Sequence, residues 1–111
     1  MKSSVRGITS VLNINELAGF QQKLPKWSLD ENKHASREYK FYNFKQAWEF
    51  MRLVSKVAMK NEHHPQWTNV YNLVSVTLTT ESVGGLSKKD LYLASFMDKA
   101  EKIIKSDQDD H

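Results

Sequence analysis

Residues 43–80 read NFKQAWEFMRLVSKVAMKNEHHPQWTNVYNLVSVTLTT, and this stretch decides the fold of the chain. Asn43 is a residue type that favours helix N-caps, and no Gly or Pro interrupts residues 44–62. Apolar side chains recur there at helical spacing, which predicts a long helix with a broad apolar face. The stripe consists of Phe44, Ala47, Met51, Val54 and Ala58, widened by Trp48, Phe50, Leu53 and Val57. We expect this stripe, including Phe44 and Trp48, to pack in the core.

The residues after Pro65 predict β-structure, because proline bars continuation of the helix. In residues 74–80, apolar Val and Leu alternate with Ser and Thr. A period of two is typical of a strand with one buried face, and here the other face carries hydroxyl groups. Residues 68–72 also contain β-branched and aromatic side chains, and they predict a short strand that leads into the longer one.

The residues on the N-terminal side predict a helix and then a β-hairpin. Asn13 with an acid three residues later matches a capping box, and apolar side chains follow at helical spacing. Pro25 ends this pattern, so we expect a helix over residues 14–23. Residues 27–29 and 36–42 form two extended runs separated by a polar segment, which predicts two paired strands.

The residues on the C-terminal side predict a turn and a last helix. Val83-Gly84-Gly85 indicates a flexible turn between strand and helix. Ser87 with Asp90 three residues later is a capping-box variant, and an apolar stripe follows, so a helix is expected over residues 87–105. Because the strands come in hairpins and do not alternate singly with helices, the pattern favours an α+β fold with an antiparallel sheet.

The composition indicates one domain over residues 1–111, with flexible ends at 1–12 and 106–111. The chain has no Cys, which excludes a disulfide scaffold, a thiolate zinc site and a Cys nucleophile. This fits the reducing cytoplasm, with the nucleus as the alternative compartment. No apolar run approaches the roughly 20 residues of a membrane span, and the N-terminal residues lack the apolar core of a secretory signal. The net charge of +3 comes without a basic cluster, so direct binding to nucleic acid is not expected.

The densest group of chemically active side chains is Glu62-His63-His64-Pro65-Gln66-Trp67, where the long helix meets the strands. Two adjacent His side chains can exchange protons near neutral pH, and junctions between rigid elements often carry function. A metal would need ligands from elsewhere, because neighbouring His side chains diverge and no His-x-x-x-His pair or Cys is present. We therefore predict no metal site. The remaining alternative is a pair of surface His residues that interact with the dipole at the helix end.

A longer pattern of residues surrounds this motif. It comprises Phe41 and Phe44, His63-His64-Pro65, Trp67, Asn69-Val70-Tyr71-Asn72, Thr77-Leu78, Gly85-Leu86-Ser87, Asp90 and Leu93-Ala94-Ser95, with Trp27 as an earlier match. In this pattern the chain resembles the pterin-4a-carbinolamine dehydratase family, also known as a dimerisation cofactor of a homeodomain transcription factor. The string His-His-Pro-x-Trp-x-Asn-x-Tyr-Asn is the most specific part of the resemblance, which covers most of the chain.

The resemblance implies a two-layer α+β fold in which helices pack on one face of a four-stranded antiparallel sheet. It implies homodimers that pair into homotetramers, and a protein partner as a further option. The implied enzyme is a 4a-hydroxytetrahydrobiopterin dehydratase, a hydro-lyase that converts 4a-hydroxytetrahydropterin to quinonoid dihydropterin and so recycles tetrahydrobiopterin. The pterin is then the substrate, and no metal or organic cofactor is used.

The resemblance also implies roles for individual residues. The reaction needs a proton donor for the departing hydroxide and a base for the proton on N5, and groups with a pKa near neutrality can serve both. His63 is implied in acid–base catalysis, and His64 chiefly in holding the pterin. The implied substrate-binding residues are Glu62, Pro65, Trp67, Thr79 and Thr80.

The sequence departs from the family at two positions. The family usually has a third His directly after Thr80, where this chain has Glu81, and an acid where this chain has Met59. A carboxylate can replace an imidazole as a general base, so Glu81 is predicted to be catalytic together with His63 and His64. Three hypotheses remain open: a working dehydratase, a non-catalytic dimerisation or coactivator-like module that has lost the third His, and a pterin-binding protein without turnover.

Overall fold

A computed structural model describes residues 9–106 of the chain, and residues 1–8 and 107–111 lie outside the described residues. Each predicted helix and strand is present, with its ends displaced by at most two residues. In chain order the elements are the helix α1 (Ile14–Lys23), the strands β1 (Ser28–Asp30) and β2 (His34–Lys40), the helix α2 (Phe44–Lys60), the strands β3 (Gln66–Val70) and β4 (Leu73–Leu78), the 3₁₀-helix η1 (Glu81–Val83) and the helix α3 (Lys88–Ser106).

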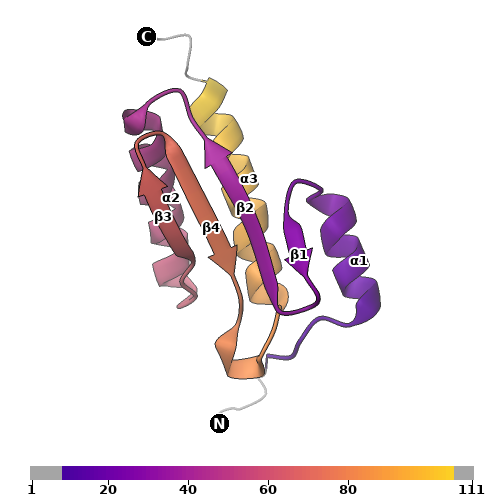
Figure 1. Ribbon diagram of the computed structural model, residues 1–111. Helices are drawn as coiled ribbons and strands as arrows, with labels where there is room; N and C mark the ends of the chain where they lie inside the picture. Colours follow the sequence, from indigo (N-terminus) through magenta and orange to yellow (C-terminus); the bar gives the residue numbers. More distant parts are fainter. Residues whose placement is uncertain (1–8, 107–111) are drawn as a thin grey trace.

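The four strands form one antiparallel sheet in the order β1-β2-β4-β3. β1 and β2 are one hairpin, β3 and β4 are the other, and the hairpins join where β2 pairs with β4. α2 and α3 lie side by side across one face of the sheet, and α1 lies next to β1 at its edge (Figure 1). The chain is therefore an α+β protein with two layers, as the sequence predicts.

The core lies between the sheet and the two long helices. Val74, Val76 and Leu78 of β4 are buried on the helix side. The ring of Phe50 on α2 lies 4.7 Å from the ring of Tyr39 on β2, measured between centroids. Because side chains alternate along a strand, the hydroxyl residues of β4 are left on the open face of the sheet.

The prediction that Phe44 and Trp48 of α2 are core residues is wrong. Phe44 is 45% exposed and Trp48 is 57% exposed, and their rings stack on each other with centroids 6.2 Å apart. The buried residues of α2 are Gln46, Ala47, Phe50, Val54 and Ala58. The apolar stripe of this helix is wider than one packing face, and its periodicity does not tell which side the sheet covers.

Side-chain caps begin the first two helices where the sequence indicates. Asn13 Oδ1 accepts a hydrogen bond from the Glu16 N–H at 2.8 Å, and the Glu16 carboxylate accepts one from the Asn13 N–H at 2.9 Å. Asn43 Oδ1 accepts from the Gln46 N–H at 2.9 Å. These bonds satisfy N–H groups that have no partner within their helix, and they fix the entry of the chain into α1 and α2.

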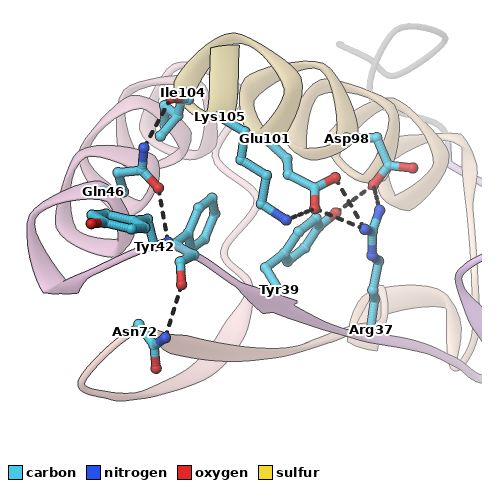
Figure 2. A network of polar contacts seen from close by, with 10 residues as sticks. Arg37, Tyr39, Tyr42, Gln46, Asn72, Asp98, Glu101, Ile104 and Lys105 are labelled. Carbon is cyan, nitrogen blue, oxygen red and sulfur yellow. Dashed lines mark hydrogen bonds and ion pairs between the residues drawn. The ribbon is translucent and has the colours of Figure 1, made fainter. Parts of the chain in front are cut away.

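A polar cluster of Arg37, Tyr39, Asp98, Glu101 and Lys105 joins β2 to α3 (Figure 2). The Arg37 guanidinium lies 2.6 Å from Asp98 Oδ1 and 3.0 Å from Glu101 Oε1. The Tyr39 hydroxyl donates to Asp98 Oδ1 at 2.5 Å, and Lys105 Nζ donates to Glu101 Oε2 at 2.9 Å. Burial, aided by Asp98, raises the pKa of Tyr39 far above its usual value, so its hydroxyl stays a donor.

The predicted flexible ends, 1–12 and 106–111, fall mainly on residues outside the described part of the chain. Leu12 does not fit the prediction, because its side chain is buried and its N–H donates to the Leu86 carbonyl at 2.8 Å. Ser106 is the last residue of α3. Within the described residues, no helix is long and apolar enough to cross a membrane.

Candidate active site

The end of α2 directs His63 into the protein. The His63 N–H donates to the Ala58 carbonyl at 3.0 Å, and the Glu62 N–H donates to the Met59 carbonyl at 3.2 Å. This pair of bonds is a Schellman motif, in which the residue after the helix cap turns left-handed. Glu62 takes that role with a φ of 53°, at a cost of order 1–3 kcal/mol for a residue other than glycine. The turn buries the His63 side chain and leaves His64 exposed.

The end of β4 and the loop around η1 lie across from this turn. Thr80 forms an isolated antiparallel bridge with Gly85, which closes the loop. A Cβ atom at Gly85 would lie 2.7 Å from the Asn32 carbonyl oxygen, so the close approach of the two backbones requires glycine. Gly84 supplies the left-handed turn with a φ of 74°. The loop holds Glu81 at the start of η1, three residues after the end of β4.

Asp90, in the first turn of α3, connects these two segments. Its Oδ1 lies 2.6 Å from Nε2 of His63. Its Oδ2 accepts hydrogen bonds from the Thr80 hydroxyl at 2.7 Å and from the Ser87 N–H at 3.0 Å. Asp90 is 0% exposed and His63 is 8% exposed.

These contacts indicate which nitrogen of a neutral His63 ring carries its proton. An ionised carboxylate only accepts hydrogen bonds, and all three groups around Asp90 can donate. A neutral His63 beside such a carboxylate carries its proton on Nε2, which leaves the lone pair on Nδ1. The pair therefore has a fixed ring orientation and one nitrogen available for proton transfer.

Most of the predicted site residues line one cavity of about 340 Å³. The predicted residues that line it are Glu62, His63, His64, Pro65, Thr79, Thr80 and Glu81. Gln66, Thr77, Ser82 and Lys89 complete the lining. The structure thus brings together the end of α2, the end of β4, η1 and the start of α3. Small-molecule sites typically have volumes of about 300–1,000 Å³, and this cavity lies in that range.

Trp67 is predicted to bind substrate, but the structure does not bring it to this cavity. It lies opposite Val76 in the β3–β4 register, on the face of the sheet that the helices cover. Its half-buried ring packs against the core, whereas its neighbour Gln66 lines the cavity. Successive residues of a strand point to opposite faces, so proximity in sequence does not give proximity in the site.

The charged groups around His63 are of both signs. The carboxylates of Glu62 and Glu81 and the ammonium group of Lys89 belong to exposed residues of the same cavity. Across residues 9–106, no cluster of three or more His, Asp, Glu or Cys residues is arranged to hold a metal ion. The absence of a metal from the reaction stays a prediction.

Asp90 has a second contact that its place in the sequence does not reveal. It is predicted as a helix cap, and it does accept a hydrogen bond from the Ser87 N–H. Its other carboxylate oxygen contacts His63, 27 residues earlier in the chain. The sequence offers one indication of this contact, because Asp90 is the single acid in a first turn that otherwise carries Lys88 and Lys89. The burial of Asp90 follows only from the packing of α3.

Comparisons with known proteins agree on one family. The family model described as pterin 4 alpha carbinolamine dehydratase matches residues 10–100. A protein of Prochlorococcus marinus (strain NATL2A), named "Putative pterin-4-alpha-carbinolamine dehydratase", is 41% identical over 92 residues, which cover 83% of this chain and 96% of that protein. A protein of Bordetella avium (strain 197N) with the same name is 44% identical over 78 residues, which cover 69% of this chain and 72% of that protein.

A solved structure extends the agreement to the fold. The crystal structure of a transcriptional coactivator/pterin dehydratase from Brucella melitensis matches with a TM-score of 0.78 and 33% sequence identity. The match covers 83% of this chain and 99% of that chain. The region matched by the family model includes the whole cavity around His63 and Asp90. The chain therefore belongs to the pterin 4 alpha carbinolamine dehydratase family.

Proposed function

We propose that the chain is a 4a-hydroxytetrahydrobiopterin dehydratase, a hydro-lyase that converts 4a-hydroxytetrahydropterin to quinonoid dihydropterin in the recycling of tetrahydrobiopterin. The observation that carries this proposal is the buried contact between His63 and Asp90 in a cavity of about 340 Å³. A His ring held by a carboxylate has a fixed orientation, which suits it for proton transfer. Membership of the family supports a pterin as the ligand of the cavity.

The reaction breaks the C4a–O bond and forms a C4a=N5 double bond. The electron pair on N5 forms the new bond, the hydroxyl leaves as water after gaining a proton, and N5 loses its proton to a base. In the proposed mechanism, protonated His63 gives its Nδ1 proton to the departing oxygen, because Asp90 holds Nε2. The Glu81 carboxylate takes the N5 proton. Both transfers use side chains of the cavity, so the mechanism needs no metal or organic cofactor.

The other cavity residues serve to hold the substrate or to support His63. His64, Glu62 and Thr79 offer hydrogen-bonding groups for the polar edge of a pterin ring. Pro65 fixes the backbone after the His pair. Thr80 acts through Asp90, since its hydroxyl donates to the carboxylate, and is therefore a positioning residue.

The proposed active unit is a homodimer or homotetramer. β1 and β3 are the outer strands of the sheet, and within the described chain each has one side without a neighbouring strand. Phe44 and Trp48 form an exposed aromatic pair on α2. Open sheet edges and exposed apolar patches both favour association with a second copy.

The proposed compartment is the cytoplasm. If the chain acts with a transcription partner, the proposed compartment is the nucleus.

An assay of quinonoid dihydropterin formation tests the proposal on the native chain and on His63→Ala. We expect the substitution to lower kcat by about 10²–10⁴-fold, the usual contribution of a general acid or base. His34→Ala is the matched control, because His34 lies at the start of β2 and does not line the cavity. A native chain that does not exceed the uncatalysed rate, while its circular dichroism shows it folded, would overturn the dehydratase.

A second candidate function is a non-catalytic dimerisation or coactivator-like module. Glu81 in place of the family's third His favours it, and the similar Brucella melitensis protein is described as a transcriptional coactivator as well as a pterin dehydratase. The two candidates differ in turnover. An inactive, folded chain that still binds dihydrobiopterin in a calorimetric titration would be a pterin-binding protein, and one that does not bind it would be the interaction module.

A further inference from the structure

A second cavity of about 260 Å³ adjoins the one that we assign to the pterin. His63 and Lys89 line both cavities, so the two are neighbours across these side chains. Most of the surface of the second cavity is apolar, and Tyr92, Leu93 and Ala58 provide it. A ligand in the first cavity therefore lies beside the second.

The charges of the two cavities differ in sign. The first cavity has two carboxylates, Glu62 and Glu81, and one ammonium group, Lys89. The second is lined by Lys88 and Lys89 and by no acid. An anionic extension of a ligand is repelled by the first cavity and attracted by the second.

Neither lysine is explained by the stability of the fold. Within the described residues, neither Lys88 nor Lys89 forms an ion pair, whereas Lys105 of the same helix pairs with Glu101 at 2.9 Å. Both lysines lie in the first turn of α3, where the helix dipole disfavours positive charge. Their side chains are exposed, so they are available to a ligand.

We propose that this second cavity binds the C6 side chain of the substrate, and that the favoured substrate is a tetrahydropterin whose side chain carries an aromatic ring and a terminal carboxylate. This inference rests on the proposed function, because it takes the pterin ring to occupy the first cavity. The aromatic ring packs on Tyr92 and Leu93, and the carboxylate binds Lys88 and Lys89. The short hydroxylated side chain of tetrahydrobiopterin is also accepted but gains less there, because His63 is held by Asp90 and the other uncharged polar side chains of the lining are only Asn61 and Tyr92.

Calorimetric binding of two unreactive ligands tests the inference. 7,8-Dihydrofolate carries an aromatic ring and carboxylates on C6, and 7,8-dihydrobiopterin carries a short uncharged chain. We expect the native protein to bind dihydrofolate about tenfold more tightly, as charge-assisted contacts permit. The double variant Lys88→Gln/Lys89→Gln is expected to reduce the ratio of the two Kd values to about one, and high ionic strength to reduce it in the native protein.

The double variant Lys99→Gln/Lys102→Gln is the matched control, since it removes the same charge from exposed positions further along α3. This control variant should still bind dihydrofolate about tenfold more tightly than dihydrobiopterin. Dihydroneopterin monophosphate supplies the charge without the ring, and binding as tight as that of dihydrofolate would overturn the aromatic part of the inference. The inference would be overturned if the ratio of the two Kd values is near one in the native protein, or if Lys88→Gln/Lys89→Gln leaves that ratio unchanged. In either case, binding of dihydrobiopterin would still support the pterin site. If neither dihydropterin binds, the pterin site itself fails and the inference fails with it.

Discussion

At the scale of single residues, the most important feature is that the two carboxylate oxygens of Asp90 contact different segments of the chain. One oxygen caps α3 through the Ser87 N–H, and the other holds Nε2 of His63. The carboxylate is fully buried, so each of these hydrogen bonds is stronger than it would be in water. The acid thereby fixes both the start of a helix and the orientation of the proposed catalytic ring.

Substitution of Asp90 by Asn tests the role of the carboxylate, because Asn has nearly the same shape but carries no charge. The amide keeps the size of the side chain, but only one of its two terminal atoms can accept hydrogen bonds, so it cannot accept from both the His63 Nε2–H and the Ser87 N–H. We expect kcat to fall by about 10²-fold or more, with a smaller change in KM, because the loss falls on the proton transfer. Steady-state kinetics checks this, with thermal unfolding to verify the fold. A kcat within about threefold of the native value would show that the His63–Asp90 contact is only structural.

At the scale of secondary-structure elements, the polar cluster ties β2 to α3. Arg37 is 7% exposed in its side chain, and it is neutralised by Asp98 and Glu101 from two successive turns of the helix. Burial raises the pKa of Glu101, but hydrogen bonds and charges from Lys105 and Arg37 outweigh it and hold that pKa below its usual value. The cluster therefore fixes the position of α3 along the sheet.

The stabilisation from Glu101 should depend on pH in a defined direction. Since the folded-state pKa is lowered, the contribution is present above the usual carboxyl pKa of about 4.3 and is lost as the pH falls through the folded-state value. Glu101→Gln should lower the free energy of unfolding by about 1–3 kcal/mol at pH 7, because it removes one of the two negative charges beside Arg37. Urea unfolding at pH 7 and near pH 3 should show the difference from the native chain shrinking in acid. A difference that is constant across this range would contradict the role of the Glu101 charge.

At the scale of the whole molecule, the single chain leaves surfaces that fit association. The β1 and β3 edges are open within the described residues, and the stacked pair Phe44–Trp48 is exposed on α2. A domain of this size buries only about two-thirds of the surface of its unfolded chain, so association would add to its stability. These features are the physical support for the proposed homodimer or homotetramer.

A charge placed on the aromatic pair should weaken the assembly. Sedimentation of the native chain at micromolar concentration is expected to show a species larger than the 12.9 kDa monomer. Trp48→Lys should shift the population toward monomer, because it puts a charge into an apolar contact. Gln22→Lys, at an exposed polar position of α1, is the control and should leave the assembly intact. A native chain that sediments only as a monomer would contradict the proposed assembly.

Local patterns in the sequence are enough to predict the helices and strands and the segment of the candidate site. The caps at Asn13 and Asn43 mark helix starts, and the alternation in β4 shows its buried face, because these signals act between residues a few positions apart. The motif over residues 62–67 likewise brings His63 and His64 together at the junction of helix and strand, because they are neighbours in the chain.

Which of these residues contact one another depends on the tertiary structure. The contact of His63 with Asp90, the turn of Trp67 away from the cavity and the exposure of Trp48 all depend on the registers and packing of elements far apart in the chain. Periodicity gives the direction of a side chain relative to its own element, and it says nothing of what the neighbouring element brings to that side. Local sequence therefore indicates which segment carries the candidate site, whereas the contact of His63 with Asp90 and the geometry of the cavity follow from the way α2, β4 and α3 pack together.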